Sequence, residues 1–174
     1  LPADRWRVAA FYSISNCEPG LRGVSLGNFL IKKVAEQLQR ELPRVRTYCT
    51  LSPIPGFAAW LLGNQGAGPD LSALAAQAGL RKPQAEALLA AHARLQATLG
   101  GDLTRLQHPA AHEALGDDDR AALQRLCAAY LLLVSPTPGG DPVARFHLDN
   151  GARLERVNLR GNMSAKGLRQ SFGL

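Results

Sequence analysis

The sequence predicts an α/β fold with a helical insertion, and three observations support this class. Residues 7–15 are rich in β-branched and aromatic side chains and end at a Glu-Pro-Gly turn, which is typical of a strand. Residues 20–28 contain three glycines and lead into an amphipathic stretch over residues 29–42. Residues 66–134 are rich in Ala and Leu with interspersed charges, and 174 residues suffice to bury a sizeable core.

A strand, a turn, a helix and a second strand follow one another along the first 52 residues. The helix is expected to pack one apolar face, made by Leu26, Phe29, Leu30, Val34 and Leu38. Pro43 ends it, and residues 44–51 have the β-branched and aromatic content of a second strand. If the two strands are parallel, Ser52 lies near residues 20–28, because loops at the carboxyl ends of neighbouring parallel strands share one edge of the sheet.

The glycine-containing turn at residues 20–28 has the properties of a phosphate site. It places unpaired backbone N–H groups at the positive end of a helix dipole. Neither the dinucleotide fingerprint nor the nucleoside-triphosphate loop fits, because the interval from Gly20 to Gly23 is wrong for the first and Asn28 replaces the lysine of the second. The turn resembles the Arg/Gln-x-x-Gly-x-Gly/Ala loop of the GNAT acetyltransferase superfamily, which holds the coenzyme A pyrophosphate. The alternative is an ordinary glycine loop that enters a surface helix.

A stiff turn follows the second strand, because Pro53 and Pro55 fix their own backbone and restrict the preceding residues. The structural alternative for Ser52 is a helix N-cap, with Pro53 at the first helical position. Further helices are predicted over residues 70–78, 82–99 and 117–134 from their caps, spacing and separating glycines. We interpret this block as an insertion that covers part of the site and has no chemistry of its own.

A short helix with a histidine near its end is predicted after residue 140. Asp141 is a suitable N-cap, Pro142 suits the first helical position, and Asn150-Gly151 provides a left-handed stop. A strand is expected to follow. The helix dipole should favour the protonated form of His147, whose ordinary pKa of about 6.5 suits proton delivery. The alternative is a histidine that is half-packed beside its neighbour Phe146.

Composition restricts the partners. A net charge of +6 favours an anionic ligand, but basic residues are scattered and only 6% of residues are aromatic, so nucleic acid is not expected. No apolar run reaches the roughly 20 residues of a membrane span, and no secretion signal is seen. A cytoplasmic protein is expected, or one of an organellar matrix if a transit peptide was removed. No metal is expected, because the pair His108 and His112 lacks further ligands and is expected to be exposed in a loop.

Three segments in order, residues 11–32, 50–57 and 142–152, resemble the catalytic domain of malonyl-CoA decarboxylase. The resemblance implies a GNAT-like mixed β-sheet flanked by helices. Residues 1–174 would form one catalytic domain, not necessarily complete at either end, with the helical insertion at about 66–134. It implies decarboxylation of malonyl-CoA to acetyl-CoA and carbon dioxide by a carbon-carbon lyase. Two other functions stay open: a GNAT-type acyl-CoA-dependent acyltransferase and a non-catalytic acyl-CoA-binding fragment.

The same resemblance assigns roles to residues. Ser52 polarises the malonyl group and His147 protonates the enolate. The coenzyme A loop of the family falls on Arg22, Gly23, Val24, Ser25, Leu26, Gly27 and Asn28. No cofactor is expected, because the thioester carbonyl is itself the electron sink and the substrate carries coenzyme A. The expected partners are malonyl-CoA and acetyl-CoA, with no nucleic acid and no membrane, and a homo-oligomer through regions absent from this sequence is left open.

Overall fold

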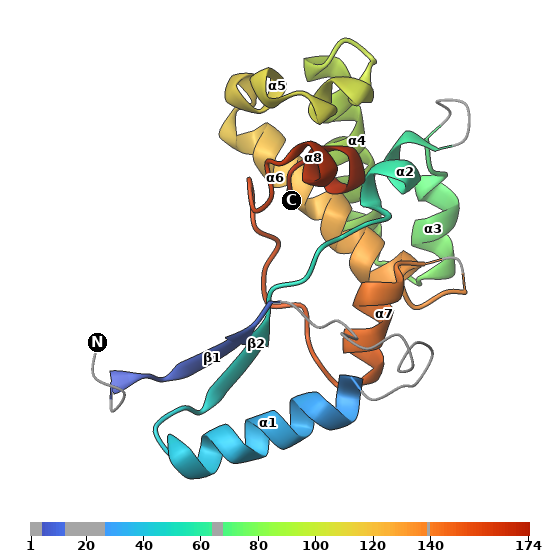
Figure 1. Ribbon diagram of the computed structural model, residues 1–174. Coiled ribbons are helices and arrows are strands. Elements are labelled where there is room, and N and C mark those ends of the chain that lie inside the picture. The colour runs from blue at the N-terminus through green and yellow to red at the C-terminus, as the bar shows by residue number, and fades with distance from the viewer. Residues whose placement is uncertain (1–4, 13–26, 64–67, 139) are drawn as a thin grey trace, which may run out of the picture. The chain divides into compact units, whose positions relative to one another are not determined.

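The computed structural model describes residues 5–12, 27–63, 68–138 and 140–174. The chain divides into two compact units, Leu1–Ser52 and Pro53–Leu174, which are described separately here. Figure 1 labels their helices and strands.

The first unit is a parallel strand pair joined by a helix, in the order β1 (Val8–Phe11), α1 (Gly27–Glu41), β2 (Thr47–Thr50). The register pairs Val8 with Thr47 and Phe11 with Thr50. The predicted strands, helix and parallel pairing are therefore confirmed, although both strands are shorter than expected. Helix α1 runs back along the pair from the end where β1 finishes (Figure 1), and the hydroxyl of Tyr48 on β2 donates to the Ala35 carbonyl, 3.3 Å away.

The predicted apolar face of α1 is only partly correct: Leu38 is half-buried as expected and Leu26 lies outside the described residues, but the other three positions are exposed. Phe29, Leu30 and Val34 are 57%, 51% and 46% exposed. The half-buried positions are Ile31, Ala35 and Leu38, spaced i, i+4, i+7. The Ala35 carbonyl accepts from Tyr48 on β2, so this side of α1 faces the strand pair.

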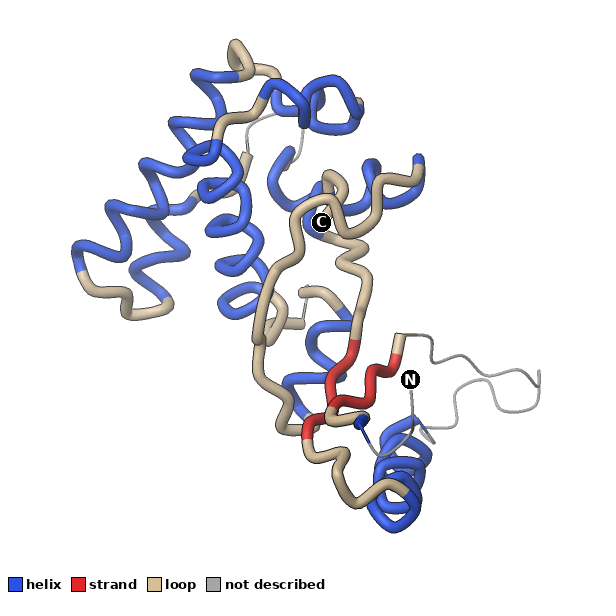
Figure 2. Tube along the Cα trace, turned by 90° about the vertical axis from the view of Figure 1, so that its left-hand side faces the viewer, coloured by secondary structure: helices blue, strands red, loops and turns tan. Residues whose placement is uncertain are grey.

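The second unit is helical. It comprises α2 (Phe57–Leu62), α3 (Leu71–Gln77), α4 (Lys82–Thr98), η4 (Leu103–Gln107), α5 (Pro109–Ala114), α6 (Asp117–Ala129), η5 (Tyr130–Val134), α7 (Pro142–Asp149) and α8 (Ala165–Ser171). Figure 2 shows these helices in blue and the two strands of the first unit in red. The helices predicted at 70–78, 82–99 and 117–134 are confirmed almost to the residue, the last with a π-helical final turn, whereas η4 and α5 were not predicted.

Helices α4 and α6 lie side by side and provide much of the core (Figure 1). Their buried apolar side chains recur at helical spacing, and they are Leu88, Ala91, Leu95, Ala122, Leu123, Leu126 and Cys127. An aromatic cluster continues this core: the Phe57 ring lies 5.9 Å from Tyr130 and 5.8 Å from Phe172, centroid to centroid. Phe57 on α2 and Phe172 after α8 are fully buried, so the segments before and after the predicted insertion share a core with it.

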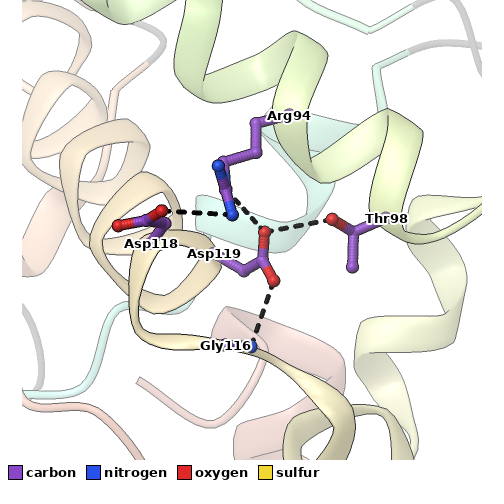
Figure 3. A network of polar contacts seen from close by, with 5 residues as sticks. All are labelled: Arg94, Thr98, Gly116, Asp118 and Asp119. Carbon is purple, nitrogen blue, oxygen red and sulfur yellow. Dashed lines mark hydrogen bonds and ion pairs between the residues drawn. The ribbon is translucent and has the colours of Figure 1, made fainter.

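A buried carboxylate fixes the start of α6 against α4 (Figure 3). Asp119 accepts hydrogen bonds from the Gly116 amide at 3.0 Å, the Thr98 hydroxyl at 3.0 Å and Arg94 Nε at 2.7 Å. Burial alone would raise the pKa of Asp119, but the three hydrogen bonds and the Arg94 charge together lower it. The charged form is therefore the stable one at neutral pH.

Three expectations are corrected or unconfirmed. No strand follows α7 in the described residues. The Val157 carbonyl accepts from the Gln124 side chain, Nε2, at 2.8 Å, and not from the backbone of a neighbouring strand. His112 is buried rather than exposed, with Nε2 2.7 Å from the Leu106 carbonyl, because α5 turns it toward η4. The mixed α/β class is confirmed, but the described strands form one parallel pair, so the GNAT-like mixed sheet is unconfirmed.

Candidate active site

Ser52 follows β2 by two residues, at the carboxyl edge of the strand pair. The Leu51 amide donates to the Phe11 carbonyl at 2.8 Å, so the pairing continues to the last residue before Ser52. Because β1 and β2 are parallel, the chain segments that leave them do so at the same edge. The exposed Ser52 therefore lies at the edge where β1 and β2 both end, whereas residues 20–26, near which it was expected, lie outside the described residues.

The structural alternative for Ser52 is wrong. Helix α2 begins at Phe57, and its N-cap is Gly56, with no side-chain capping bond. Ser52 and Pro53 precede that cap by four and three residues, since the two prolines and the turn at residues 55–56 keep the chain out of the helix. Ser52 therefore does not cap α2, and it is exposed.

The helix that carries His147 is built as its sequence predicts. The Asp141 carboxylate accepts from the Val143 and Ala144 amides at 2.9 and 3.1 Å, which caps α7, and Pro142 occupies the first turn. At the other end Gly151 has φ +81°, a backbone conformation that glycine adopts without strain. The chain therefore stops α7 two residues after His147.

His147 is half-buried, and its ring meets the edge of Phe146 at 5.2 Å between centroids. Burial lowers the pKa of His147. The expected effect of the helix dipole, which would favour the protonated form, is thus outweighed by desolvation. The ring is thus half-packed beside Phe146, as the alternative interpretation expected, and the role of His147 as a proton donor stays a prediction.

Asp141 also binds the turn that follows Ser52. Its second oxygen, Oδ2, accepts from the Gly56 amide at 3.2 Å and faces the Tyr130 hydroxyl at 3.5 Å. The side chain is 1% exposed. One buried carboxylate thus joins the start of α7, the start of α2 and the end of α6, and the sequence, which identified Asp141 only as a cap, gave no signal for a bond to a residue 85 positions away.

The predicted coenzyme A loop lies largely outside the described residues, which include neither Arg22, Gly23 and Val24 nor Ser25 and Leu26. Gly27 and Asn28 are the first two residues of α1. That helix has 15 residues and no acidic residue in its first turn, so no side chain of that turn opposes an anion at its N-terminus. Ser52 belongs to the first unit together with α1, and His147 belongs to the second.

Within the described ranges, no group of three or more His, Cys, Asp or Glu side chains has the arrangement of a metal site. A search of the same residues finds no helix with the length and apolarity needed to cross a bilayer.

Known proteins resemble this chain over nearly its whole length. A family model described as the malonyl-CoA decarboxylase C-terminal domain matches residues 1–174. The mitochondrial malonyl-CoA decarboxylase of Mus musculus is 39% identical over 178 residues, covering 98% of this chain and 35% of the relative, and that of Rattus norvegicus is 38% identical with the same coverage. A crystal structure of malonyl-CoA decarboxylase from Rhodopseudomonas palustris is 40% identical with a TM-score of 0.67, covering 99% of this chain and 36% of that chain. The chain therefore spans about a third of the length of these relatives.

Proposed function

Because this chain belongs to the malonyl-CoA decarboxylase family by its match to the C-terminal domain, we propose that it carries the catalytic residues for converting malonyl-CoA to acetyl-CoA and carbon dioxide. The observation that carries the proposal is the likeness over nearly the whole chain, at 39% identity to the mouse relative and 40% to the bacterial structure. The expected GNAT-like fold of the domain, residues 1–174 with an insertion at about 66–134, belongs to the same proposal.

The reaction needs two kinds of group. Loss of carbon dioxide leaves an enolate on the thioester, which requires a hydrogen-bond donor near the reacting oxygens and a proton for the carbon. In our proposal the Ser52 hydroxyl holds the malonyl group and His147 gives the proton. The position of Ser52 outside any helix cap and the short helix that ends just after His147 support these roles.

The lowered pKa of His147 suits a proton donor, because a more acidic imidazolium transfers its proton to carbon more readily. A malonyl carboxylate bound nearby would favour the charged imidazolium, since an opposite charge opposes the effect of burial. In this proposal the carboxylate of the substrate favours protonation of His147, which then serves as the acid. The reaction requires no further cofactor, because the thioester carbonyl accepts the electron pair.

The coenzyme A end of the substrate is proposed to bind the backbone amides of residues 22–28 and the N-terminus of α1. The parallel register supports this arrangement, since β1, the strand that precedes residues 22–28 in the sequence, ends at the edge that also holds Ser52. Malonyl-CoA and acetyl-CoA are then the partners of the chain. The relatives in mouse and rat are named mitochondrial, which is consistent with an organelle as its compartment.

The test is release of labelled carbon dioxide from malonyl-CoA carrying label in the free carboxylate. Ser52→Ala and His147→Asn should each lower the rate roughly 100-fold or more. Ser72→Ala and His108→Asn, which make the same changes at exposed positions, should leave it unchanged. Amine-dependent release of free coenzyme A would instead indicate an acyltransferase, and tight coenzyme A binding without turnover would indicate a non-catalytic binding protein.

A further inference from the structure

Asp141 joins two segments that the proposed reaction needs to hold in place. Its Oδ1 binds the first turn of α7, the helix of His147, through the Val143 and Ala144 amides. Its Oδ2 binds the Gly56 amide, at the end of the double-proline turn that begins directly after Ser52. We propose that Asp141 is a positioning residue that fixes the α7 helix to this turn, a role that rests on the proposed function.

Burial makes this link stiff. Asp141 is 1% exposed, and three backbone amides and the Tyr130 hydroxyl surround its two oxygens. Backbone donors cannot rotate away as side chains can, and a buried carboxylate that loses one of them is left with an unsatisfied charge. The turn and the helix are therefore expected to move together rather than independently.

The packing around Gly56 supports the same conclusion. A Cβ added at Gly56 would overlap the Tyr130 hydroxyl and lie 3.2 Å from Tyr130 Cζ and 3.6 Å from Asp141 Oδ2. The backbone at Gly56 has φ −103°, which any residue adopts, so the need for glycine is one of space. Tyr130 thus closes the remaining side of the contact between Gly56 and Asp141.

Substitution by asparagine separates the two halves of the link. Asparagine caps helices about as well as aspartate, so Asp141→Asn keeps the start of α7. Its amide nitrogen replaces Oδ2 and faces the Gly56 N–H with another donor, so the bond to the turn is lost, while the Tyr130 hydroxyl, which donates to Oδ2, can turn to accept from the new amide. We expect kcat for malonyl-CoA to fall roughly 10- to 100-fold, because small displacements of reacting groups have effects of this size.

The KM for malonyl-CoA should change by less than about twofold in Asp141→Asn, since the amides proposed to hold coenzyme A lie elsewhere in the chain. Asp149→Asn, the same change at an exposed position on α7, is the matched control and should leave both constants unaltered. Gly56→Ala should lower kcat in the same manner, and Tyr130→Phe in the Gly56→Ala background should restore part of it.

The results separate a failure of the positioning role of Asp141 from a failure of the proposed decarboxylation. A wild-type chain that releases no carbon dioxide refutes the proposed function and the inference with it. An active wild-type chain whose Asp141→Asn variant keeps its kcat overturns the positioning role alone. A variant that loses kcat only in proportion to its loss of folded protein, measured by circular dichroism, overturns it as well, because the residue would then act on stability and not on geometry.

Discussion

Removing the Asp119 carboxylate should destabilise the helical unit markedly. Asp119 is 5% exposed and accepts from Gly116, Thr98 and Arg94 (Figure 3). Hydrogen bonds to a charged group contribute about 1.5–3 kcal/mol each, but such losses do not add. Arg94 is 48% exposed and regains water, so its ion pair counts for little. For Asp119→Ala we expect the free energy of unfolding to fall by about 2–3 kcal/mol.

The assay is urea unfolding followed by circular dichroism at neutral pH, with thermal unfolding beside it. For a chain of this size, about 2–3 kcal/mol corresponds to roughly 4–12 °C in the melting temperature. Asp118→Ala is the matched control, because Asp118 contacts the same arginine at 3.4 Å but is 79% exposed, and its loss should cost less than about 0.5 kcal/mol.

The pH dependence gives an independent check on Asp119. Its pKa in the folded protein is lowered from 3.8, so its contribution to stability is present above that value and is lost as the pH falls through the folded pKa. The difference between wild type and Asp119→Ala should therefore shrink in acid. Equal unfolding free energies for Asp119→Ala and Asp118→Ala at pH 7 would refute the reasoning.

Three further predictions concern the helical unit. Leu123→Ala, at a fully buried position, should lower the free energy of unfolding by about 2–5 kcal/mol in urea titrations, and a loss below about 1 kcal/mol would contradict the core described here. Burial, with a smaller contribution from Asp141, raises the pKa of Cys127 to about 12, so peptide mapping after alkylation should find Cys127 unmodified in native protein and modified in urea. Burial lowers the pKa of His92 below 6.5, and its buried Nε2 has no hydrogen-bond partner in the described structure. As the pH falls from 6.5 to the folded pKa, the wild type should therefore lose stability relative to His92→Leu. Parallel dependences of the unfolding free energy on pH in the two proteins would refute this prediction.

Local signals were sufficient for most of the helices. Asp141 is an N-cap as predicted, Asp70 caps the helix predicted from that residue onward, the acidic residues Asp117 to Asp119 occupy the first turn of α6, and Gly151 ends α7. Each of these signals depends on residues within one turn of the position concerned, which is why the sequence alone contains them. The parallel strand pair was predictable for a similar reason, because a helix between two short strands fits a crossover.

Tertiary packing decided the features that were missed. The inner face of α1 is the side on which the Ala35 carbonyl accepts from Tyr48 of β2, and Phe29, Leu30 and Val34 lie outside it. His112 is buried because its ring reaches the Leu106 carbonyl, a partner six residues away on another element. A strand pattern after α7 did not become a strand, since the Val157 carbonyl binds a side chain of α6. These outcomes depend on partners that no local pattern specifies.

The candidate site likewise combines residues that the sequence identified with a contact that only the structure shows. Family resemblance identified Ser52 and His147, and the structure excludes a capping role for the serine and shows a half-buried imidazole. The bond from Gly56 to Asp141 joins residues 85 positions apart, and so could not be read from spacing. Their roles in the reaction stay predictions.

The roles proposed for Ser52 and His147 require both side chains to reach the malonyl group of the same bound thioester. A crystal structure with a malonyl-CoA analogue that cannot lose carbon dioxide tests this requirement most directly. We expect both side chains within roughly 2.6–3.2 Å of the malonyl group or of one bridging water, with the diphosphate on the amides of residues 22–28. An analogue bound elsewhere, or the two side chains on opposite sides of the protein, would contradict it.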